Sequence, residues 1–340
     1  MSWFALHMPD GPWISEMAPP DDDLVVRGAL VIETRLPDIR RPMPLLAYEQ
    51  KGDWPLYIAL HALPGGGIAM VLNQAGDVIH RMLDCTQSGR ADVLRVTYVW
   101  DAPKRRGWLA LELPGHPGIE IQQVRDPKPF RAGDLCRLTN PGDQGFIAPD
   151  VLWIGLADAP QPVGPMPTLL PDTPVDTPSG YRRVEELKRG DLVLSGEGRS
   201  VPVLQTVRRM VPATGSFAPV RMRAPYFGLR RDIVVGALQR ILVSGSDIDY
   251  LFGHEAALIR AGDLLAGPAV QAVRCGRFVP YVQLLLPEPA SLECCGARLE
   301  SLFIGRLRRK PEHLAASVLA NADRTVLPEH AQPLQPVLRA

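Results

Sequence analysis

Hydrophobic and polar positions along the N-terminal half follow the short-period patterns of β-strands. Residues 24–36 and 93–100 are rich in β-branched and aromatic side chains, the second reading Val-Leu-Arg-Val-Thr-Tyr-Val-Trp. Runs of this kind, too short and too β-branched for an amphipathic helix, favour strands. Further runs of the same type cover 54–61, 67–73, 107–113 and 152–157. The pattern therefore predicts several strands within the first 158 residues.

Turn residues separate these runs. The segment Leu-Pro-Gly-Gly-Gly at 63–67 stands between two strand-like runs and predicts a hairpin. A phosphate-binding loop is excluded, because neither Lys-Ser/Thr nor a helical pattern follows the glycines. Asn-Pro-Gly-Asp at 140–143 is a second turn signal. Strands at intervals of roughly 10 to 20 residues are typical of an antiparallel β-sandwich.

The C-terminal half has shorter β-branched runs at 192–194, 201–208, 220–223, 233–235 and 241–243, and a helical pattern with proline at its start over 311–321. Repeated proline over 159–167 predicts a linker. We therefore expect a mainly β protein with a jelly-roll-like sandwich (1–158), a linker (159–167), a second β domain (168–305) and a helix with a tail (306–340).

Composition narrows the functional classes. The 37 Lys and Arg residues balance 37 Asp and Glu residues, which argues against nucleic acid or acidic lipid as partner. No apolar run reaches the roughly 20 residues that span a bilayer, and the start lacks the basic and apolar regions of a signal peptide. Location is thus cytoplasmic by default, and the oligomeric state stays open.

The cysteines indicate neither a metal site nor a disulfide framework. Their spacing, with Cys294 next to Cys295, matches no zinc motif and allows no ordinary bond between those two. We expect no cofactor and no metal, and we expect Cys275, Cys294 and Cys295 to be buried thiols. The remaining two are Cys85 and Cys136.

A colinear series of motifs begins at Thr168. Thr173, Val175, Thr177, Pro178 and Gly180 are followed by Val-Glu-Glu-Leu at 184–187 and Gly-Asp-Leu-Val-Leu at 190–194, with further blocks at 211–214, 217–221, 251–253, 261–264 and 281–285. The series resembles the bacterial Hint (Hedgehog/intein) self-processing domain from Thr168 to about Gly305. The resemblance implies a horseshoe-like β fold and a scissile bond between Pro167 and Thr168.

The residues that would carry this chemistry are replaced. In the family the first position is a nucleophilic cysteine, whereas this chain has Thr168; two histidine positions hold Gln239 and Gln283. A threonine hydroxyl needs an adjacent base, and glutamine has no proton that titrates near neutral pH. His254 is the one histidine between Thr168 and Gly305, and its loop position favours solvent exposure. The resemblance thus implies catalytic positions that have lost their activity.

Three functions follow from the sequence. The leading one is a Hint-family protein that has lost self-cleavage and serves as a structural or interaction module. An active self-cleaving protein that uses Thr168 is the first alternative. The second is glycan or surface binding by the N-terminal half, because the run Arg-Val-Thr-Tyr-Val-Trp-Asp-Ala-Pro at 95–103 is similar to laminin-G or concanavalin-A-like sandwiches. Trp54, Trp100, Trp108 and Trp153 are either sugar-stacking or core residues, and the core is favoured.

Overall fold

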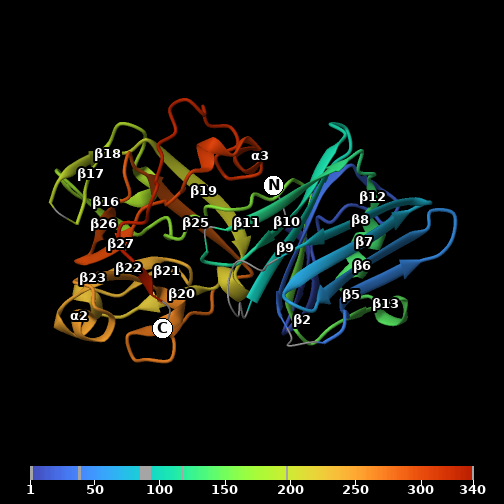
Figure 1. The fold of residues 1–340 in the computed structure, drawn as a ribbon, viewed down its shortest axis with the longest axis horizontal. Coiled ribbons are helices and arrows are strands. Elements are labelled where there is room, and N and C mark those ends of the chain that lie inside the picture. The colour runs from blue at the N-terminus through green and yellow to red at the C-terminus, as the bar shows by residue number, and fades with distance from the viewer. Residues whose placement is uncertain (1–2, 37–39, 85–92, 117, 197, 339–340) are drawn as a thin grey trace. The chain divides into compact units, whose positions relative to one another are not determined.

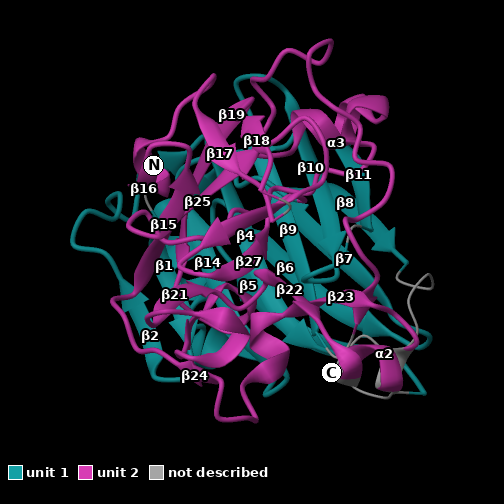
Figure 2. Ribbon diagram, turned by 90° about the vertical axis from the view of Figure 1, so that its left-hand side faces the viewer, with its two compact units in different colours: residues 1–163 teal, residues 164–340 magenta. Residues whose placement is uncertain are grey.

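The chain folds into two compact units, Met1–Val163 and Gly164–Ala340, coloured separately in Figure 2. The computed structural model describes residues 3–36, 40–84, 93–116, 118–196 and 198–338. Cys85 lies outside the described residues. Strands dominate both units, as the sequence predicts (Figure 1). In the described part of the chain, no helix is both long enough and apolar enough to cross a membrane.

Unit 1 is a β-sandwich of two antiparallel sheets. The larger sheet has the order β11 (Ile119–Arg125), β10 (Arg106–Glu112), β9 (Val93–Asp101), β4 (Arg27–Arg35), β14 (Val151–Ala157), β1 (Trp3–Met8) and β2 (Gly11–Ile14). The smaller sheet has the order β13 (Gly145–Ile147), β5 (Met43–Gln50), β6 (Leu56–Leu63), β7 (Gly67–Gln74) and β8 (Asp77–Leu83). The short strands β3 (Leu24–Val25) and β12 (Phe130–Arg131) pair with each other, and the helix α1 (Ala132–Leu138) follows β12.

The hairpin predicted at the glycine cluster is confirmed. Strands β6 and β7 pair from Leu56 with Gln74 to Leu63 with Gly67. In the turn, Gly65 and Gly66 have φ values of 87° and 101°. Residues with a Cβ atom rarely adopt such positive φ values. The glycines therefore act as turn formers.

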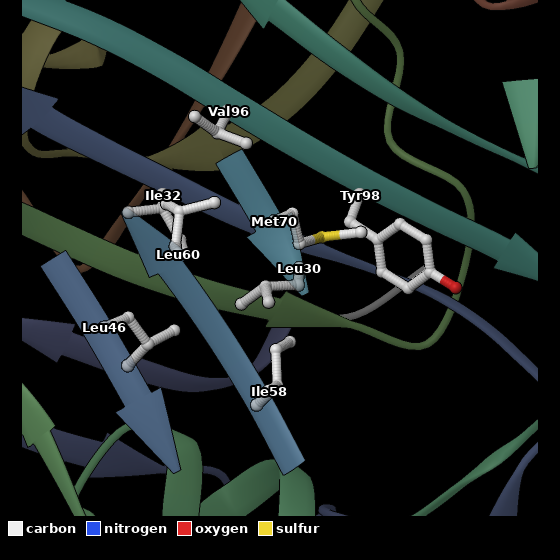
Figure 3. A pocket seen from close by; sticks show the side chains of 8 residues that line it. All are labelled: Leu30, Ile32, Leu46, Ile58, Leu60, Met70, Val96 and Tyr98. Atoms are coloured by element: carbon white, nitrogen blue, oxygen red, sulfur yellow. The ribbon is translucent and has the colours of Figure 1, made fainter. Parts of the chain in front are cut away.

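Side chains from both sheets fill the core of unit 1 almost completely. One void among them measures about 10 Å³, which is at the lower limit for one water molecule. Figure 3 shows the residues that line it: Leu30, Ile32, Leu46, Ile58, Leu60, Met70, Val96 and Tyr98. Because the lining is apolar and the space so small, this void is a packing defect and not a ligand site.

We expect Leu60→Ala to lower the free energy of unfolding by about 2–5 kcal/mol, because it enlarges this void in a core that cannot collapse fully. Urea denaturation measures the change. The matched control is Val78→Ala on β8, whose side chain is 62% exposed, with an expected change within about 0.5 kcal/mol. Equal losses for the two variants would contradict the packing described here.

Unit 2 is assembled from short strand pairs, which are antiparallel except for the parallel pair of β23 (Ala256–Arg260) and β28 (Val337–Leu338). Its two-stranded pairs are β15 (Pro174–Thr177) with β16 (Gly180–Arg183), β17 (Leu192–Leu194) with β18 (Ser200–Pro202), and β19 (Gln205–Pro212) with β25 (Phe278–Leu285). A three-stranded sheet has the order β21 (Ile233–Gly236), β20 (Pro219–Met222), β24 (Val270–Ala272). A five-stranded sheet has the order β26 (Ser291–Cys294), β27 (Ala297–Glu300), β22 (Arg240–Ser244), β23, β28. The helix α2 (Ser246–Phe252) connects β22 to β23.

The C-terminal helix is shorter than the sequence predicts. The helix α3 covers Pro311–Ala315, whereas the pattern suggested 311–321. The Ser317 hydroxyl donates a hydrogen bond to the Leu314 carbonyl at 2.9 Å, and the Leu319 N–H donates to the Ser317 hydroxyl at 3.1 Å. Serine that bonds to nearby backbone in this way competes with helical hydrogen bonds, so the helix ends before it.

A buried histidine fixes the tail that follows α3. The Ile304 N–H donates to Nδ1 of His330 at 3.3 Å, and Nε2 of the same ring donates to the Leu286 carbonyl at 3.1 Å. The ring lies 5.9 Å from that of Phe303 and is fully buried. One ring nitrogen must accept and the other donate, so this geometry requires the neutral imidazole.

The pKa of His330 is lowered from its ordinary value of 6.5, because burial disfavours the imidazolium. Below that pH the unfolded chain binds a proton that the folded chain does not. The free energy of unfolding should therefore fall as the pH drops from there toward the folded-state pKa, by up to about 1.4 kcal/mol per pH unit. His330→Gln should show a flatter decrease in urea titrations, while His254→Gln, at an exposed histidine, should keep the wild-type slope. Identical slopes for all three proteins would exclude this role.

Candidate functional site

The backbone around Thr168 is held between two strands of unit 2. Leu169 forms single bridges with Val235 of β21 and Val282 of β25. Its N–H donates to the Val282 carbonyl at 3.1 Å, and the Val282 N–H returns a bond of 2.8 Å. The Gly236 N–H donates to the Thr168 carbonyl at 2.6 Å. The junction after Pro167 is therefore part of the sheet structure and not a free strand end.

The three residues singled out from the sequence lie together. Thr168, Gln239 and Gln283 are 6%, 1% and 2% exposed. The Thr168 hydroxyl donates to Oε1 of Gln239 at 2.6 Å, and Nε2 of Gln283 donates to the same oxygen at 3.1 Å. Nε2 of Gln283 also lies 3.4 Å from the Thr168 hydroxyl oxygen. The fold thus brings residues 71 and 44 positions apart into one buried polar cluster.

The backbone carbonyl of Glu300 fixes the orientation of both glutamines. It accepts Nε2 of Gln239 at 3.1 Å and Nε2 of Gln283 at 3.0 Å. Nε2 of Gln239 donates in addition to the Arg240 carbonyl at 2.7 Å. Because the NH₂ group of Gln239 is committed to two carbonyls, its oxygen must face Thr168. The direction of the hydroxyl proton, from threonine to glutamine, follows from this.

A buried ion pair supports the strand that carries this carbonyl. Nη1 of Arg240 lies 3.1 Å from Oε2 of Glu300, and both side chains are largely buried. Burial raises the pKa of the Glu300 carboxyl, and Arg240 opposes this shift. The pair joins β22 to β27 close to the glutamines. Sequence reasoning missed both residues; the available signal was an acid and a base, each adjoining an apolar strand segment.

Local sequence places each member of the cluster. On β25, Val282 and Leu284 belong to the apolar core, so the alternation of a strand puts Gln283 on the opposite face with Tyr281. The Tyr281 hydroxyl donates to the Phe217 carbonyl at 2.9 Å. A Cβ on Gly236 would lie 3.1 Å from the Tyr281 ring, so a larger residue would crowd this turn. The turn after β21 then returns the chain to Gln239, whose N–H donates to the Gly236 carbonyl at 2.9 Å.

The side chains of Thr168, Gln239 and Gln283 provide hydrogen bonds, but none of the three titrates near neutral pH. The Thr168 hydroxyl faces an amide oxygen, which accepts a hydrogen bond without taking up the proton. Oε1 of Gln283 is buried and has no hydrogen-bond partner among the described residues. A buried amide oxygen in this state costs free energy unless a water molecule satisfies it.

The remaining histidine and cysteines of the motif region lie elsewhere. His254 is exposed in the loop after α2, as predicted, and no hydrogen bond within the described chain joins it to Pro167 or Thr168. Cys294 and Cys295 are buried at the β26–β27 hairpin, and burial raises the pKa of the Cys294 thiol. The expectation of a buried thiol is wrong for Cys275, which is exposed in the connection between β24 and β25.

The family of unit 2 follows from a direct match. The family model described as the Hint domain matches residues 167–306. The chain therefore contains a Hint domain. Its matched segment begins at the residue before Thr168 and includes Gln239, Gln283 and Glu300. No curated protein matches the chain.

Solved structures resemble the two units separately. A bacterial intein-like domain from Clostridium thermocellum is 14% identical, covers 40% of this chain and 99% of that chain, and has a TM-score of 0.29. The MchDnaB-1 intein is 16% identical, covers 39% and 98%, and has a TM-score of 0.27. The CBM40 of the Ruminococcus gnavus IT-sialidase, bound to α2,3 sialyllactose, is 18% identical, covers 38% and 62%, and has a TM-score of 0.25.

We expect the hydrogen bond between Thr168 and Gln239 to produce a measurable coupling free energy in a double-mutant cycle. Thr168→Val and Gln239→Leu should each destabilise the protein, by about 1–3 kcal/mol for the loss of a buried partner. The double variant should lose less than the sum, with a coupling of about 0.5 kcal/mol or more in urea denaturation. Thr214→Val, at a half-buried threonine outside the cluster, should be additive with Gln239→Leu. If the losses of stability from Thr168→Val and Gln239→Leu were also additive, this would contradict the hydrogen bond between the two residues.

Proposed function

We propose that the Hint domain of this protein has lost self-cleavage and serves as a structural or interaction module. The main support for this proposal is the direction of one hydrogen bond, in which the Thr168 hydroxyl donates to the amide oxygen of Gln239. A nucleophile in this family must lose that proton to attack, and the partners of the Thr168 hydroxyl among the described residues are amides, which do not take it up. The match of residues 167–306 to the Hint domain supports the assignment to the autoprocessing family.

Self-cleavage would require an acyl shift at the Pro167–Thr168 bond, and this step needs a proton transfer. In an acyl shift, the Thr168 oxygen would bond to the Pro167 carbonyl carbon and the Pro167–Thr168 C–N bond would break. The hydroxyl proton would move to the leaving nitrogen of Thr168. A positioned acid or base usually contributes about 10²–10⁴ to the rate of such a transfer. The contributions do not simply multiply, but the loss of even one slows the reaction severely.

An active protein that forms an ester at Thr168 is the alternative. A threonine hydroxyl is a weak nucleophile unless a base stands beside it, and both neighbours in this cluster are amides. Pro167 also has no N–H and restricts the backbone before the junction. These features favour the inactive state.

The deciding experiment is intact-mass spectrometry of the purified full-length chain, with and without a thiol and hydroxylamine. We expect the wild type to keep its full mass, because the Thr168 hydroxyl faces two amides that cannot take up its proton. The variant Thr168→Cys/Gln239→His should release fragments 1–167 and 168–340, because a thiol and a base are restored. The control Thr168→Ala/Gln239→His retains the base without a nucleophile and should stay intact.

A wild-type chain that yields a fragment ending at Pro167, with cleavage abolished by Thr168→Ala, would refute the proposed loss of activity. It would establish the ester-forming alternative instead.

Glycan or surface binding by unit 1 stays a prediction. Of the four tryptophans considered, Trp100 and Trp153 are fully buried and cannot stack on a sugar. Trp54 and Trp108 are half-buried, and the Arg131 guanidinium lies 5.8 Å from the centre of the Trp54 ring. Glycan-array binding by the full-length chain that is lost in Trp54→Ala would support this role.

A further inference from the structure

A basic pocket on unit 2 lies apart from the Thr168 cluster. It has a volume of about 300 Å³ and is formed by the turn after Leu187 and the first half of β19. Three of its lining residues carry a positive charge: Lys188, Arg189 and Arg208. Thr206 adds a polar surface to the wall of the pocket, and the half-buried Leu204 adds an apolar one.

No acidic side chain lines this pocket in the described part of the chain. Two carboxylates close to the pocket in sequence, those of Glu185 and Asp191, each pair with an arginine that does not line it. Oε1 of Glu185 lies 2.7 Å from Nη2 of Arg183. Oδ2 of Asp191 lies 3.2 Å from Nη1 of Arg182 and accepts the Lys188 N–H at 2.9 Å. The walls therefore concentrate positive charge without a carboxylate of their own, which favours an anion as occupant.

Hydrogen bonds to the backbone hold the walls in place. Nη2 of Arg208 donates to the Glu185 carbonyl at 2.6 Å, and the Thr206 hydroxyl donates to the Leu187 carbonyl at 2.6 Å. The Gly190 N–H donates to the Val203 carbonyl at 2.8 Å, and Gly190 has a φ of 92°, which favours glycine at this turn. A guanidinium fixed at one nitrogen keeps its other N–H groups for a ligand, at a reduced entropic cost.

The distribution of charge between the units agrees with this. Residues 164–340 contain 22 Lys and Arg against 17 Asp and Glu, whereas residues 1–163 contain 15 against 20. The pocket thus belongs to the unit with the positive excess, which would attract anions to it.

We propose that this pocket binds a small multivalent anion, namely the phosphate or sulfate group of a small molecule. Arginine pairs with such groups through two parallel N–H bonds, and the lysine adds a point charge. A volume of about 300 Å³ is at the lower end for ligand sites, so the group and a short attached moiety would fill it. Among the described residues that line the pocket none is aromatic, so none can stack on a base, which disfavours a nucleic acid strand.

Calorimetric titration of the full-length chain with inorganic pyrophosphate, and separately with sulfate, tests the proposal at low ionic strength. We expect saturable binding that Arg208→Gln weakens by about tenfold or more, because a charged hydrogen bond is lost. The matched control is Arg221→Gln, at an exposed arginine of β20, which should change the dissociation constant less than about twofold. Inorganic phosphate, whose charge and shape are close to those of sulfate, is titrated as a third anion: tighter binding of phosphate than of sulfate would assign the pocket to phosphate esters, and the reverse order to sulfate esters.

Because Arg208 also bonds to the Glu185 carbonyl, Lys188→Gln provides a second variant whose side chain has no such role, and circular dichroism checks the fold of both. The proposal is overturned if none of the three anions binds at millimolar concentration, or if Arg221→Gln weakens binding as much as Arg208→Gln. Tighter, Arg208-dependent binding of a single-stranded oligonucleotide than of pyrophosphate would also overturn it, in favour of nucleic acid.

Discussion

The hydrogen bond from the Thr168 hydroxyl to the Gln239 amide oxygen determines what the junction of this protein can do. It gives the hydroxyl a stable partner inside a buried site, and this partner is an amide oxygen that does not take up a proton. In a low-dielectric interior, such a bond rigidifies the groups it joins, and an unpaired hydroxyl there would be costly. The same bond stabilises the junction and places an amide oxygen, which does not titrate, next to the hydroxyl.

The rest of the cluster enforces this arrangement. Two amide NH₂ groups converge on one backbone carbonyl, that of Glu300, and this convergence turns the Gln239 oxygen toward Thr168. Histidine in either position would offer a titratable nitrogen, whereas glutamine retains the hydrogen bonds without the titration. The cluster thus holds two amides where histidines would move protons, and the proposed loss of self-cleavage rests on this difference.

Much of the fold was predictable because strand patterns are local. The hairpin of β6 and β7, the long strand β9 and the short strand β17 all follow from β-branched runs bounded by turn residues. Other elements were missed. The strand β5 was not predicted. The helix α1 was not predicted either, because it is short and its sequence shows no clear helical pattern. The end of α3 depends on the Ser317 hydroxyl, a contact that competes with helical hydrogen bonding and that a propensity argument does not weigh.

The sequence by itself determined the mainly β class, the Hint family of the second half, and the positions of Thr168, Gln239 and Gln283, because each rests on residue types in a fixed order. Only the tertiary structure decided that these three share one buried cluster, and that Glu300 orients the two amides. It also decided the burial of His330 and the exposure of Cys275. These properties arise from packing between strands far apart along the chain, and no local pattern encodes which distant backbone carbonyl a side chain will meet.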